Sequence, residues 1–313
     1  MSKGSGKPVE KRLEEDVCRE LNLLVGTLLA AAKHEDLLGE GDLTSEAIIP
    51  GGLRVKGHYL AKASGVVAGM ALLPDVFAVF CGEDDEVAVR PFVPDGARVK
   101  AGTRLAEVAG PGRAVLAGER TGLNLLCHLS GVATLTAEYV KRTAGTSAKI
   151  YDTRKTTPGM RLLEKWAVSI GGGMNHRMGL WDGVLIKDNH LALVGASIGE
   201  AVHRARERVR GLPGRRSLVE VEVTSLAGVR EALSSGADIV MLDNFTPARA
   251  AIAVKLARKL ARGRGRPVEI EISGGVNLKT VRAFARANPD RISIGALTHS
   301  APAMDISLEL ERA

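Results

Sequence analysis

The chain has 313 residues, of which 45% are hydrophobic and 25% are charged, and its length indicates about two globular domains. This composition excludes a disordered or fibrous protein. The longest apolar stretch, Leu23 to Ala32, is about half of a membrane span, and the N-terminus lacks the apolar region of a secretory signal. We therefore expect a soluble, cytoplasmic protein with no membrane partner. Three cysteines, far apart and without a CxxC pair, argue against a disulfide framework and a protein-ligated structural metal.

The net charge of +7 suggests nucleic acid as a candidate partner, but the excess positive charge is concentrated in two segments. Residues 203–216 and 249–266 together hold thirteen basic residues and one acid, and without them the chain would be acidic. Both segments have the pattern of helices and their exits, so we interpret the charge as solvated helix faces. Aromatic residues make up 3% of the chain and leave little to stack on bases, so we expect no nucleic-acid partner.

The first part of the chain mixes helices with short strands. We expect a flexible tail over residues 1–11. Apolar residues recur at helical spacing over residues 10–33, which predicts a helix that begins near the end of this tail. The motif GEGDLTS (Gly39–Ser45) has the composition of a loop. Further elements are short strands over 53–63, 86–92 and 98–108, a helix near 70–80, and a long amphipathic helix over 118–143.

From residue 148 onward, apolar strands alternate with helical patterns. The candidate strands are 148–151, 183–186, 218–223, 239–242, 268–272 and 291–294, and the helical patterns lie near 158–170, 191–210, 225–235, 247–262 and 277–287. Such alternation predicts right-handed crossovers and a parallel sheet. Because a closed barrel of this kind needs eight strands, six strands predict an incomplete α/β barrel, with an open doubly wound sheet as the alternative.

Basic residues gather after the first two of these strands. Arg154 and Lys155 follow the first strand, His176 and Arg177 precede the second, and Lys187 follows it. The carboxyl ends of parallel strands are where active sites form in such folds. A group of cations there suits an anion with several carboxylates or phosphates, because arginine binds such groups through two parallel hydrogen bonds.

The later strand ends carry glycines and carboxylates. Ser273, Gly274 and Gly275 follow the fifth strand, and Gly295 and Ala296 follow the sixth. Missing side chains let backbone N–H groups approach a phosphate, so these loops are candidates for a phosphate site. Glu222 and Asp243, on the third and fourth strands, are candidates to hold Mg²⁺ or to accept sugar hydroxyls, and charge balance against the lysines is the alternative.

The same residues carry a resemblance to a known family. The segment Asp152–His190, which begins DTRKTTPGM and ends IKDNH, resembles the core signature of the quinolinate phosphoribosyltransferases, the carboxylating nicotinate-nucleotide pyrophosphorylases. The motifs EVEVTSL, MLDNF, EISGGV and SIGALTHSAPAMDISL follow in the family's order, and GEGDLTS and ERTGLNLLCHLSG resemble its N-terminal motifs. The resemblance covers nearly all of residues 12–311.

The resemblance implies an α/β sandwich domain (12–130 and 300–313) and an incomplete α/β barrel that forms the catalytic domain (131–299). It also implies transfer of phosphoribosyl from phosphoribosyl pyrophosphate to quinolinate with Mg²⁺, which gives nicotinate mononucleotide, pyrophosphate and CO₂ in NAD biosynthesis. Thr153, Arg154, Lys155, His176, Arg177 and Lys187 would then line the quinolinate pocket. Glu222 and Asp243 match the ribose and metal side, and Ser273, Gly274, Gly275, Gly295, Ala296 and His299 match the phosphate side.

Arg120 matches an arginine that the family's partner subunit inserts into the site, so the resemblance also implies a homodimer or a homohexamer. We expect Arg154, His176 and Arg177 to clamp the substrate carboxylates, with Lys155 and Lys187 nearer the reacting centre. Three alternatives stay open at this point. They are a molybdenum-associated paralogue with another acceptor, a barrel aldolase that uses Lys155 or Lys187 as a Schiff base, and a nucleic-acid binder that uses the basic helices.

Overall fold

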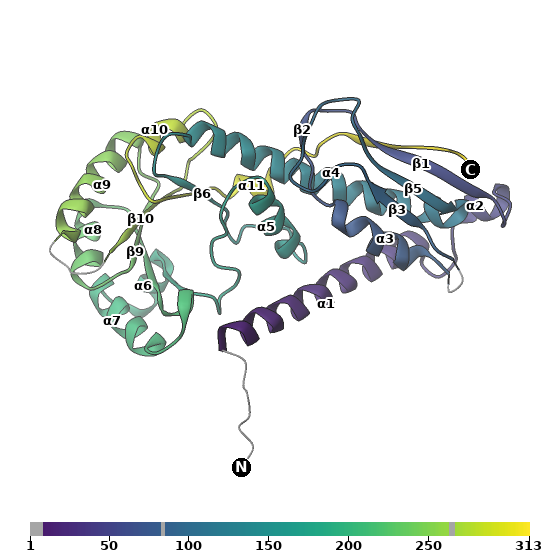
Figure 1. The fold of residues 1–313 in the computed structure, drawn as a ribbon. Helices are drawn as coiled ribbons and strands as arrows, with labels where there is room; N and C mark the ends of the chain where they lie inside the picture. The colour runs from purple at the N-terminus through teal and green to yellow at the C-terminus, as the bar shows by residue number, and fades with distance from the viewer. Residues whose placement is uncertain (1–8, 83–84, 263–266) are drawn as a thin grey trace, which may run out of the picture. The chain divides into compact units, whose positions relative to one another are not determined.

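A computed structural model describes residues 9–82, 85–262 and 267–313, together with their side chains except those of 9–22 and 215–216. The chain divides into two compact units (Figure 1). The first comprises the chain up to Ser130 with Pro158–Leu162 and Ala303–Ala313, and the second comprises Gly131–Thr157 and Leu163–Pro302. Most of the expected tail (residues 1–8) lies outside the described residues, and residues 9–11 are already helical.

The first unit is built on a four-stranded antiparallel sheet. Its order is β12 (Ile306–Arg312), β1 (Arg54–Ala61), β5 (Arg104–Pro111) and β3 (Ala88–Pro91), and β2 (Gly65–Val66) pairs separately with β4 (Arg98–Val99). Alternate residues of β1 are buried, as expected for a sheet with one covered face. Tyr59 and Leu105 from the sheet share one core with Phe77 from α3 (Leu73–Phe80) and Leu126 from α4 (Gly112–Thr143), so these two helices cover that face.

Two local features of this unit differ from the sequence expectation. The end of the expected loop at Gly39–Ser45 is helical, because Asp42 caps α2 (Leu43–Ile48) by accepting the N–H groups of Thr44 (3.1 Å) and Ser45 (3.0 Å). The C-terminal strand β12, which the strand pattern did not single out, pairs with β1 along its whole length. The remaining elements of this unit are α1 (Val9–Leu37) and the short helix η1 (Met70–Leu72).

The second unit contains a six-stranded parallel sheet, which confirms the six strands expected from the sequence. The order is β6 (Lys149–Tyr151), β11 (Arg291–Ser293), β10 (Glu269–Ser273), β9 (Ile239–Asp243), β8 (Val219–Val223) and β7 (Val184–Ile186). All five strand pairings are parallel. β6 and β7 stand at the two edges of this sheet, so the barrel is incomplete.

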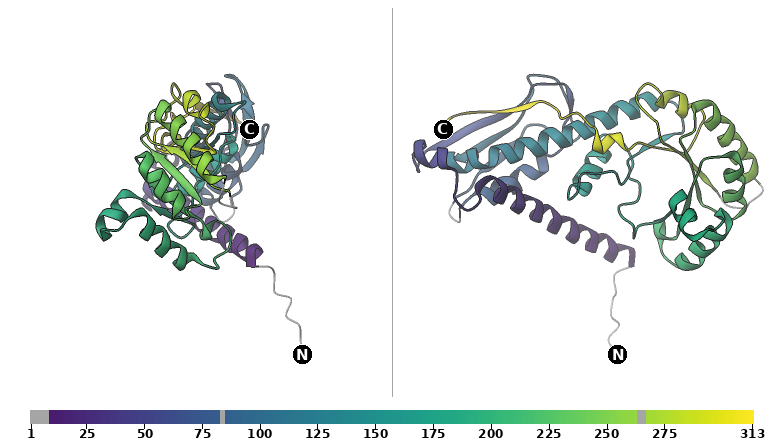
Figure 2. Two further views of the ribbon diagram at one scale, coloured as in Figure 1. Left: turned by 90° about the vertical axis from the view of Figure 1, so that its left-hand side faces the viewer. Right: turned by 180° about the vertical axis from the view of Figure 1, so that it is seen from behind.

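Helices α7 (Ile198–Val209), α8 (Leu226–Ser234), α9 (Pro247–Ala261) and α10 (Val281–Ala285) lie on the outer side of this curved sheet (Figures 1 and 2). The unit also contains α5 (Arg161–Ile170), α6 (Asp188–Val194), α11 (Ala296–His299) and η2 (Gly214–Ser217). The single helix expected near 191–210 is two helices, because Gly195 ends α6 in the left-handed conformation and Ser197 caps α7.

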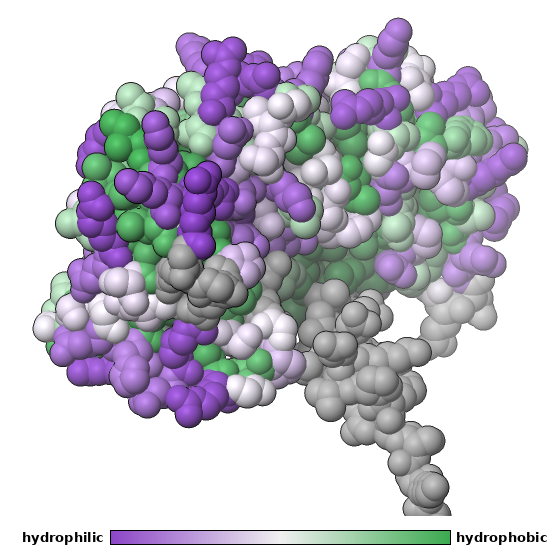
Figure 3. Space-filling model, turned by 60° about the vertical axis from the view of Figure 1, so that its left-hand side comes forward, coloured by the Kyte–Doolittle hydropathy of each residue, from purple (hydrophilic) through white to green (hydrophobic). Residues whose placement is uncertain are grey.

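The basic segments on α7 and α9 have partly structural roles. Arg206 binds Gly236 O and Asp238, Arg258 binds Val268 O and Asp290, and Arg249 packs over the ring of Phe245. These contacts tie the helices to the sheet, and Figure 3 shows other hydrophilic side chains spread among apolar ones on the surface. Residues 263–266 of the second segment lie outside the described part of the chain. No helix among the described residues is both long and apolar enough to span a membrane.

Candidate active site

A cavity of about 540 Å³ opens at the carboxyl ends of the parallel strands in the second unit. This volume is in the usual range for a small-molecule site. It is lined by all of the candidate site residues except Arg120, namely Thr153, Arg154, Lys155, His176, Arg177, Lys187, Glu222, Asp243, Ser273, Gly274, Gly275, Gly295, Ala296 and His299. Further lining residues, which the motifs did not single out, are Leu185, Met241, Asn244, Val276, Ser293 and Ile294.

Two arginines converge at one end of the cavity. The Nε of Arg154 is buried and has no hydrogen-bond partner, and the guanidinium of Arg177 donates to Gly183 O at 2.8 Å. Burial lowers the pKa of Arg177, and the nearby charge of Arg154 lowers it further. Both effects disfavour the positive charge of Arg177. A bound dianion would relieve them, so this end of the cavity is suited to an acid with two carboxylates.

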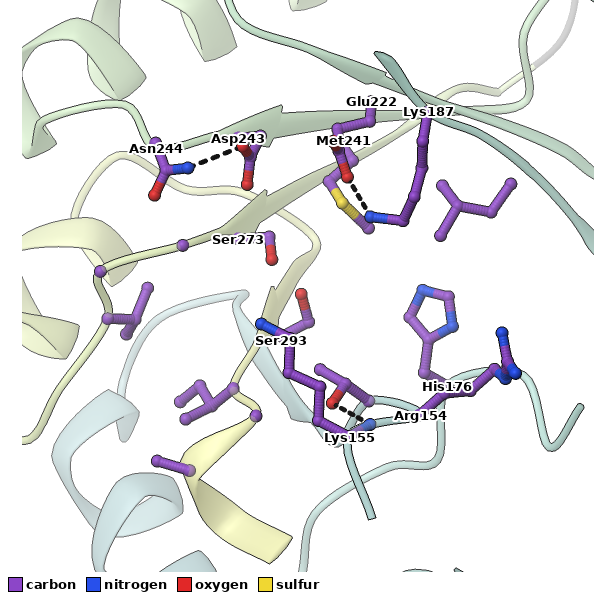
Figure 4. Close-up of a pocket in the computed structure, with 18 of the residues that line it drawn as sticks. Arg154, Lys155, His176, Lys187, Glu222, Met241, Asp243, Asn244, Ser273 and Ser293 are labelled. Carbon is purple, nitrogen blue, oxygen red and sulfur yellow. Dashed lines mark hydrogen bonds and ion pairs between the residues drawn. The ribbon is translucent and has the colours of Figure 1, made fainter. Parts of the chain in front are cut away.

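The two lysines have different surroundings. Lys187 forms an ion pair with Glu222, whose side chain is 10% exposed, and Figure 4 shows this pair on the same side of the pocket as His176. Lys155 is exposed, and its main-chain N–H donates to Thr153 Oγ1 at 3.0 Å. Lys187 is therefore held in place by its ion pair with Glu222, whereas the side chain of Lys155 extends toward Ser293 (Figure 4).

The opposite end of the pocket is suited to phosphate. Gly274 and Gly275 both have positive φ angles (+83° and +66°), which favour glycine and turn the backbone after β10. A Cβ at Gly274 would lie 2.9 Å from the main-chain N of Asn244, and a Cβ at Gly295 would lie 2.9 Å from Cδ of Lys155. Bare backbone is thus required at Gly274, where φ is positive and the close atom belongs to the main chain, whereas a Cβ at Gly295 would displace flexible side chains. In Figure 4, Asp243, Asn244 and Ser273 lie together at this end, and Asn244 Nδ2 donates to Asp243 at 2.7 Å.

His176 is held by a buried network below the cavity. Asp152 and Lys165 form a fully buried ion pair, and Lys165 Nζ also donates to His176 O at 3.0 Å. Asp152 accepts the main-chain N–H of His176 (2.8 Å) and the side-chain amide of Asn175 (2.7 Å). Burial raises the pKa of Asp152, and Lys165 opposes that rise. The network fixes the backbone that carries His176.

Both ring nitrogens of His176 already face protein groups. Nδ1 accepts the main-chain N–H of Arg177 at 2.8 Å, and Nε2 lies 3.2 Å from Glu220 and 3.5 Å from Glu271. Burial disfavours a charged ring, and the two carboxylates favour one. Because a second proton on Nδ1 would break the hydrogen bond that Nδ1 accepts from the Arg177 N–H, this geometry assigns a single proton, on Nε2. The expected role of His176 in clamping a substrate carboxylate stays a prediction; its Nε2 is buried and makes no hydrogen bond within the described part of the chain.

Four charged residues of this network had no role assigned from the sequence: Asp152, Lys165, Glu220 and Glu271. Their signal was a charged side chain within an apolar, alternating pattern, as in EIEIS (Glu269–Ser273), where Glu271 is fully buried. A buried charge requires partners, and these partners come from other strands and loops.

Arg120 lies on α4, in the part of that helix that belongs to the first unit, and its side chain is exposed. It is not among the residues that line the cavity.

Comparisons with known proteins match the chain over nearly its whole length. The family model for the quinolinate phosphoribosyl transferase N-terminal domain matches residues 42–130, and that for the C-terminal domain matches residues 132–309. A carboxylating nicotinate-nucleotide pyrophosphorylase of Mycobacterium leprae is 42% identical over 283 residues, which are 89% of this chain and 94% of the relative. A mitochondrial quinolinate phosphoribosyltransferase of Nicotiana tabacum is 39% identical over 298 residues (91% and 81% of the two chains).

The structure is also similar to that of the nicotinate-nucleotide pyrophosphorylase from Francisella tularensis. The TM-score is 0.83 at 34% identity, and the match covers 93% of this chain and 97% of that one. Both family models, these relatives and the fold agree. The chain belongs to the quinolinate phosphoribosyltransferase family.

Proposed function

We propose that this protein transfers phosphoribosyl from phosphoribosyl pyrophosphate to quinolinate and releases pyrophosphate and CO₂, which makes nicotinate mononucleotide for NAD biosynthesis. One observation carries the proposal beyond family membership. A single cavity joins two converging arginines at one end to bare glycine backbone and a carboxylate at the other. That arrangement suits a dicarboxylate beside a phosphorylated sugar.

Arg154 and Arg177 are the groups best placed to bind the two carboxylates of quinolinate. Arg154 offers a buried Nε without a partner, and Arg177 is anchored through Gly183 O at 2.8 Å. The negative charge of quinolinate would offset the repulsion between the two guanidinium groups. Nicotinate has one carboxylate and would leave part of that repulsion in place, so we expect a preference for the dicarboxylate.

The glycine loops are proposed to bind the phosphate groups of phosphoribosyl pyrophosphate, with Ser273 and His299 beside them. Glu222 and Asp243 provide oxygen atoms of the kind that Mg²⁺ takes, and Mg²⁺ is commonly held by one or two carboxylates together with substrate phosphates. Asp243 accepts one hydrogen bond from Asn244, whereas Glu222 is paired with Lys187, so Asp243 is the better candidate ligand. Bound Mg²⁺ would stabilise the negative charge on the departing pyrophosphate.

The proposed reaction needs no general base in the protein. The pyridine nitrogen of quinolinate has a free lone pair and forms a bond to the anomeric carbon as the bond from that carbon to pyrophosphate breaks. When the adjacent carboxylate departs as CO₂, the electron pair of the broken bond stays on the ring carbon, where the positive pyridinium nitrogen stabilises it, and that carbon then takes up a proton. The contribution of Arg154, Arg177 and the glycine loops is therefore to position both substrates and to stabilise charge.

We further propose that a second copy of the chain provides Arg120. Its side chain is exposed, and the cavity lacks it. Exposed apolar side chains such as Leu180, Trp181, Leu193 and Val194 are consistent with self-association. Sedimentation at nanomolar concentration tests this, because a fully active monomer would contradict the proposal. A cytoplasmic location also stays a prediction, which cell fractionation would test.

The first experiment is to incubate the purified protein with phosphoribosyl pyrophosphate, Mg²⁺ and either quinolinate or nicotinate. We expect nicotinate mononucleotide and CO₂ in equal amounts from quinolinate, and loss of product when Mg²⁺ is chelated. Product from nicotinate alone would mean that the two arginines recognise an acid with one carboxylate. No product from either acid, with a folded protein, would favour a paralogue with another acceptor.

A further inference from the structure

A second charged layer lies directly below the pocket. Side chains of a strand alternate between its two faces, so Glu220 shares a face with Glu222 on β8 and Glu271 shares a face with Ser273 on β10. Glu222 and Ser273 line the cavity, which places Glu220 and Glu271 one layer deeper. They are 3% and 0% exposed, although such interiors are usually filled by branched apolar residues.

Arg291 and the ring of His176 lie against the carboxylates of this layer. A carboxylate oxygen of Glu271 lies 4.0 Å from the guanidinium of Arg291. Arg291 also forms an ion pair with Glu269, which lies on β10 together with Glu271. Glu220 and Glu271 both approach Nε2 of His176, at 3.2 and 3.5 Å. Burial raises the pKa of Glu220, with the Glu271 charge adding to the rise, whereas the contacts of Glu271 with His176 outweigh its burial and lower its pKa. Glu271 is thus the charged carboxylate beside His176; Nε2 and both carboxylate oxygens of Glu271 are buried and make no hydrogen bond to any described residue, so the contact is electrostatic.

The same three side chains offer ligand atoms within 4.8 Å of one another, as a metal site would. One observation favours an internal network of charged groups instead. The guanidinium of Arg291 already occupies one flank of Glu271, where a cation would be repelled. The small cavity lined by His176, Glu220 and Arg291 has a volume of about 20 Å³, enough for about one water molecule but too small for a substrate group.

We propose that Glu220 and Glu271 are positioning residues for the carboxylate-binding end of the active site, acting through His176 on Arg177. The two carboxylates lie 3.2 and 3.5 Å from Nε2 and attract its proton electrostatically. This fixes the ring so that Nδ1 can accept the main-chain N–H of Arg177 at 2.8 Å. Arg177 is then fixed at two points, at its own N–H and at Gly183 O. The inference rests on the proposed function only where it says that Arg177 binds quinolinate.

One test does not depend on the substrate. Long-range ¹H–¹⁵N NMR spectra of the ¹⁵N-labelled protein report the tautomer of His176, assigned by its loss in His176→Asn. We expect a proton on Nε2 and a lone pair on Nδ1 in the wild type, retained in Glu269→Gln and Glu271→Gln but lost or averaged in Glu271→Leu. Glu271→Gln is a control because glutamine keeps an oxygen atom at this position. Glu269→Gln is a control because Glu269 lies on β10 and contacts Arg291 but does not contact His176. A wild-type proton on Nδ1, or an unchanged spectrum in Glu271→Leu, would overturn the proposal.

The second test measures quinolinate binding by calorimetry in a double-mutant cycle. We expect Glu271→Leu to weaken binding roughly 5- to 150-fold in the wild-type background, the usual effect of removing one partner from a buried polar contact, and less than about twofold in an Arg177→Ala background. Glu271→Gln should restore most of the affinity, and Glu269→Gln should leave it unchanged. Equal losses in both backgrounds would show that Glu271 does not act through Arg177.

Two further outcomes are separable from these. A folded wild type that binds no quinolinate would overturn the proposed function, while the NMR result would still decide the His176 network. Stoichiometric zinc in the purified wild type, lost in Glu271→Leu, would overturn the network in favour of a metal site.

Discussion

Lys165 is fully buried, and replacing it tests how the pocket is supported. Its ammonium binds the carboxylate of Asp152 and also donates to His176 O at 3.0 Å. In Lys165→Met the carboxylate would keep two hydrogen bonds, from Asn175 and from the His176 N–H, but no cation. Removing one partner of a buried ion pair costs about 3–5 kcal/mol. At roughly 2–4 °C per kcal/mol, the unfolding temperature of the second unit should fall by about 6–20 °C.

The pH dependence of this variant has a definite sign. Burial already raises the pKa of Asp152, and Lys165 is the main influence that opposes the rise. Without Lys165 the native-state pKa should rise further above that of the unfolded chain. The native protein then holds a proton that the unfolded chain releases, so stability is lost as pH rises through the native pKa. The destabilisation by Lys165→Met should therefore be smaller at pH 5 than at pH 8.

The assay is thermal unfolding of the wild type, Lys165→Met, Asp152→Asn and the double variant at both pH values. If the two charges act as a pair, the double variant should be less destabilised than the sum of the single variants by roughly 1–3 kcal/mol. A shift below about 2 °C in Lys165→Met, or strictly additive single effects, would refute the reasoning. Lys149, an exposed lysine at the start of β6, provides the control as Lys149→Met.

Three other predictions concern the pocket itself. Arg177→Ala should lower kcat/KM for quinolinate roughly 10- to 150-fold, because one charge-assisted hydrogen-bonding partner is lost, and an unchanged value would remove Arg177 from substrate binding. Gly274→Ala should raise KM for phosphoribosyl pyrophosphate more than Gly275→Ala does, since only the first adds a clash with Asn244 to the backbone strain; equal effects would contradict the bare-backbone argument. Mixing inactive Arg120→Ala and Lys187→Ala chains under exchange conditions should restore about a quarter of the wild-type activity if a partner supplies Arg120, whereas no recovery would count against a shared site.

Much of the second unit follows from local sequence patterns. Each strand is a short apolar run bounded by turn residues, and each helix has its own periodicity, so their existence is determined locally. The polar ends of the strands, such as Arg154 and Asp243, follow from the same pattern, because parallel strands bring their carboxyl ends to one edge. The break between α6 and α7 was missed, since Gly195 and Ser197 act through cap geometry rather than apolar spacing.

Pairing between distant segments was decided only by the tertiary structure. The strand β12 lies against β1, some 250 residues earlier in the chain, and nothing in its own alternating pattern names that partner. Glu220 and Glu271 lie on β8 and β10, which are separated in the sheet by β9. Their convergence on His176 depends on strand order and curvature, which no local pattern specifies.

The sequence by itself determined which residues gather at the pocket, Arg120 excepted, because side chains at the carboxyl ends of parallel strands meet at one edge of the sheet. The tertiary structure alone decided how those residues are held. Buried charges such as Asp152, Lys165 and Glu271 are stable only where partners from other elements meet them, and burial and partners are properties of the folded chain.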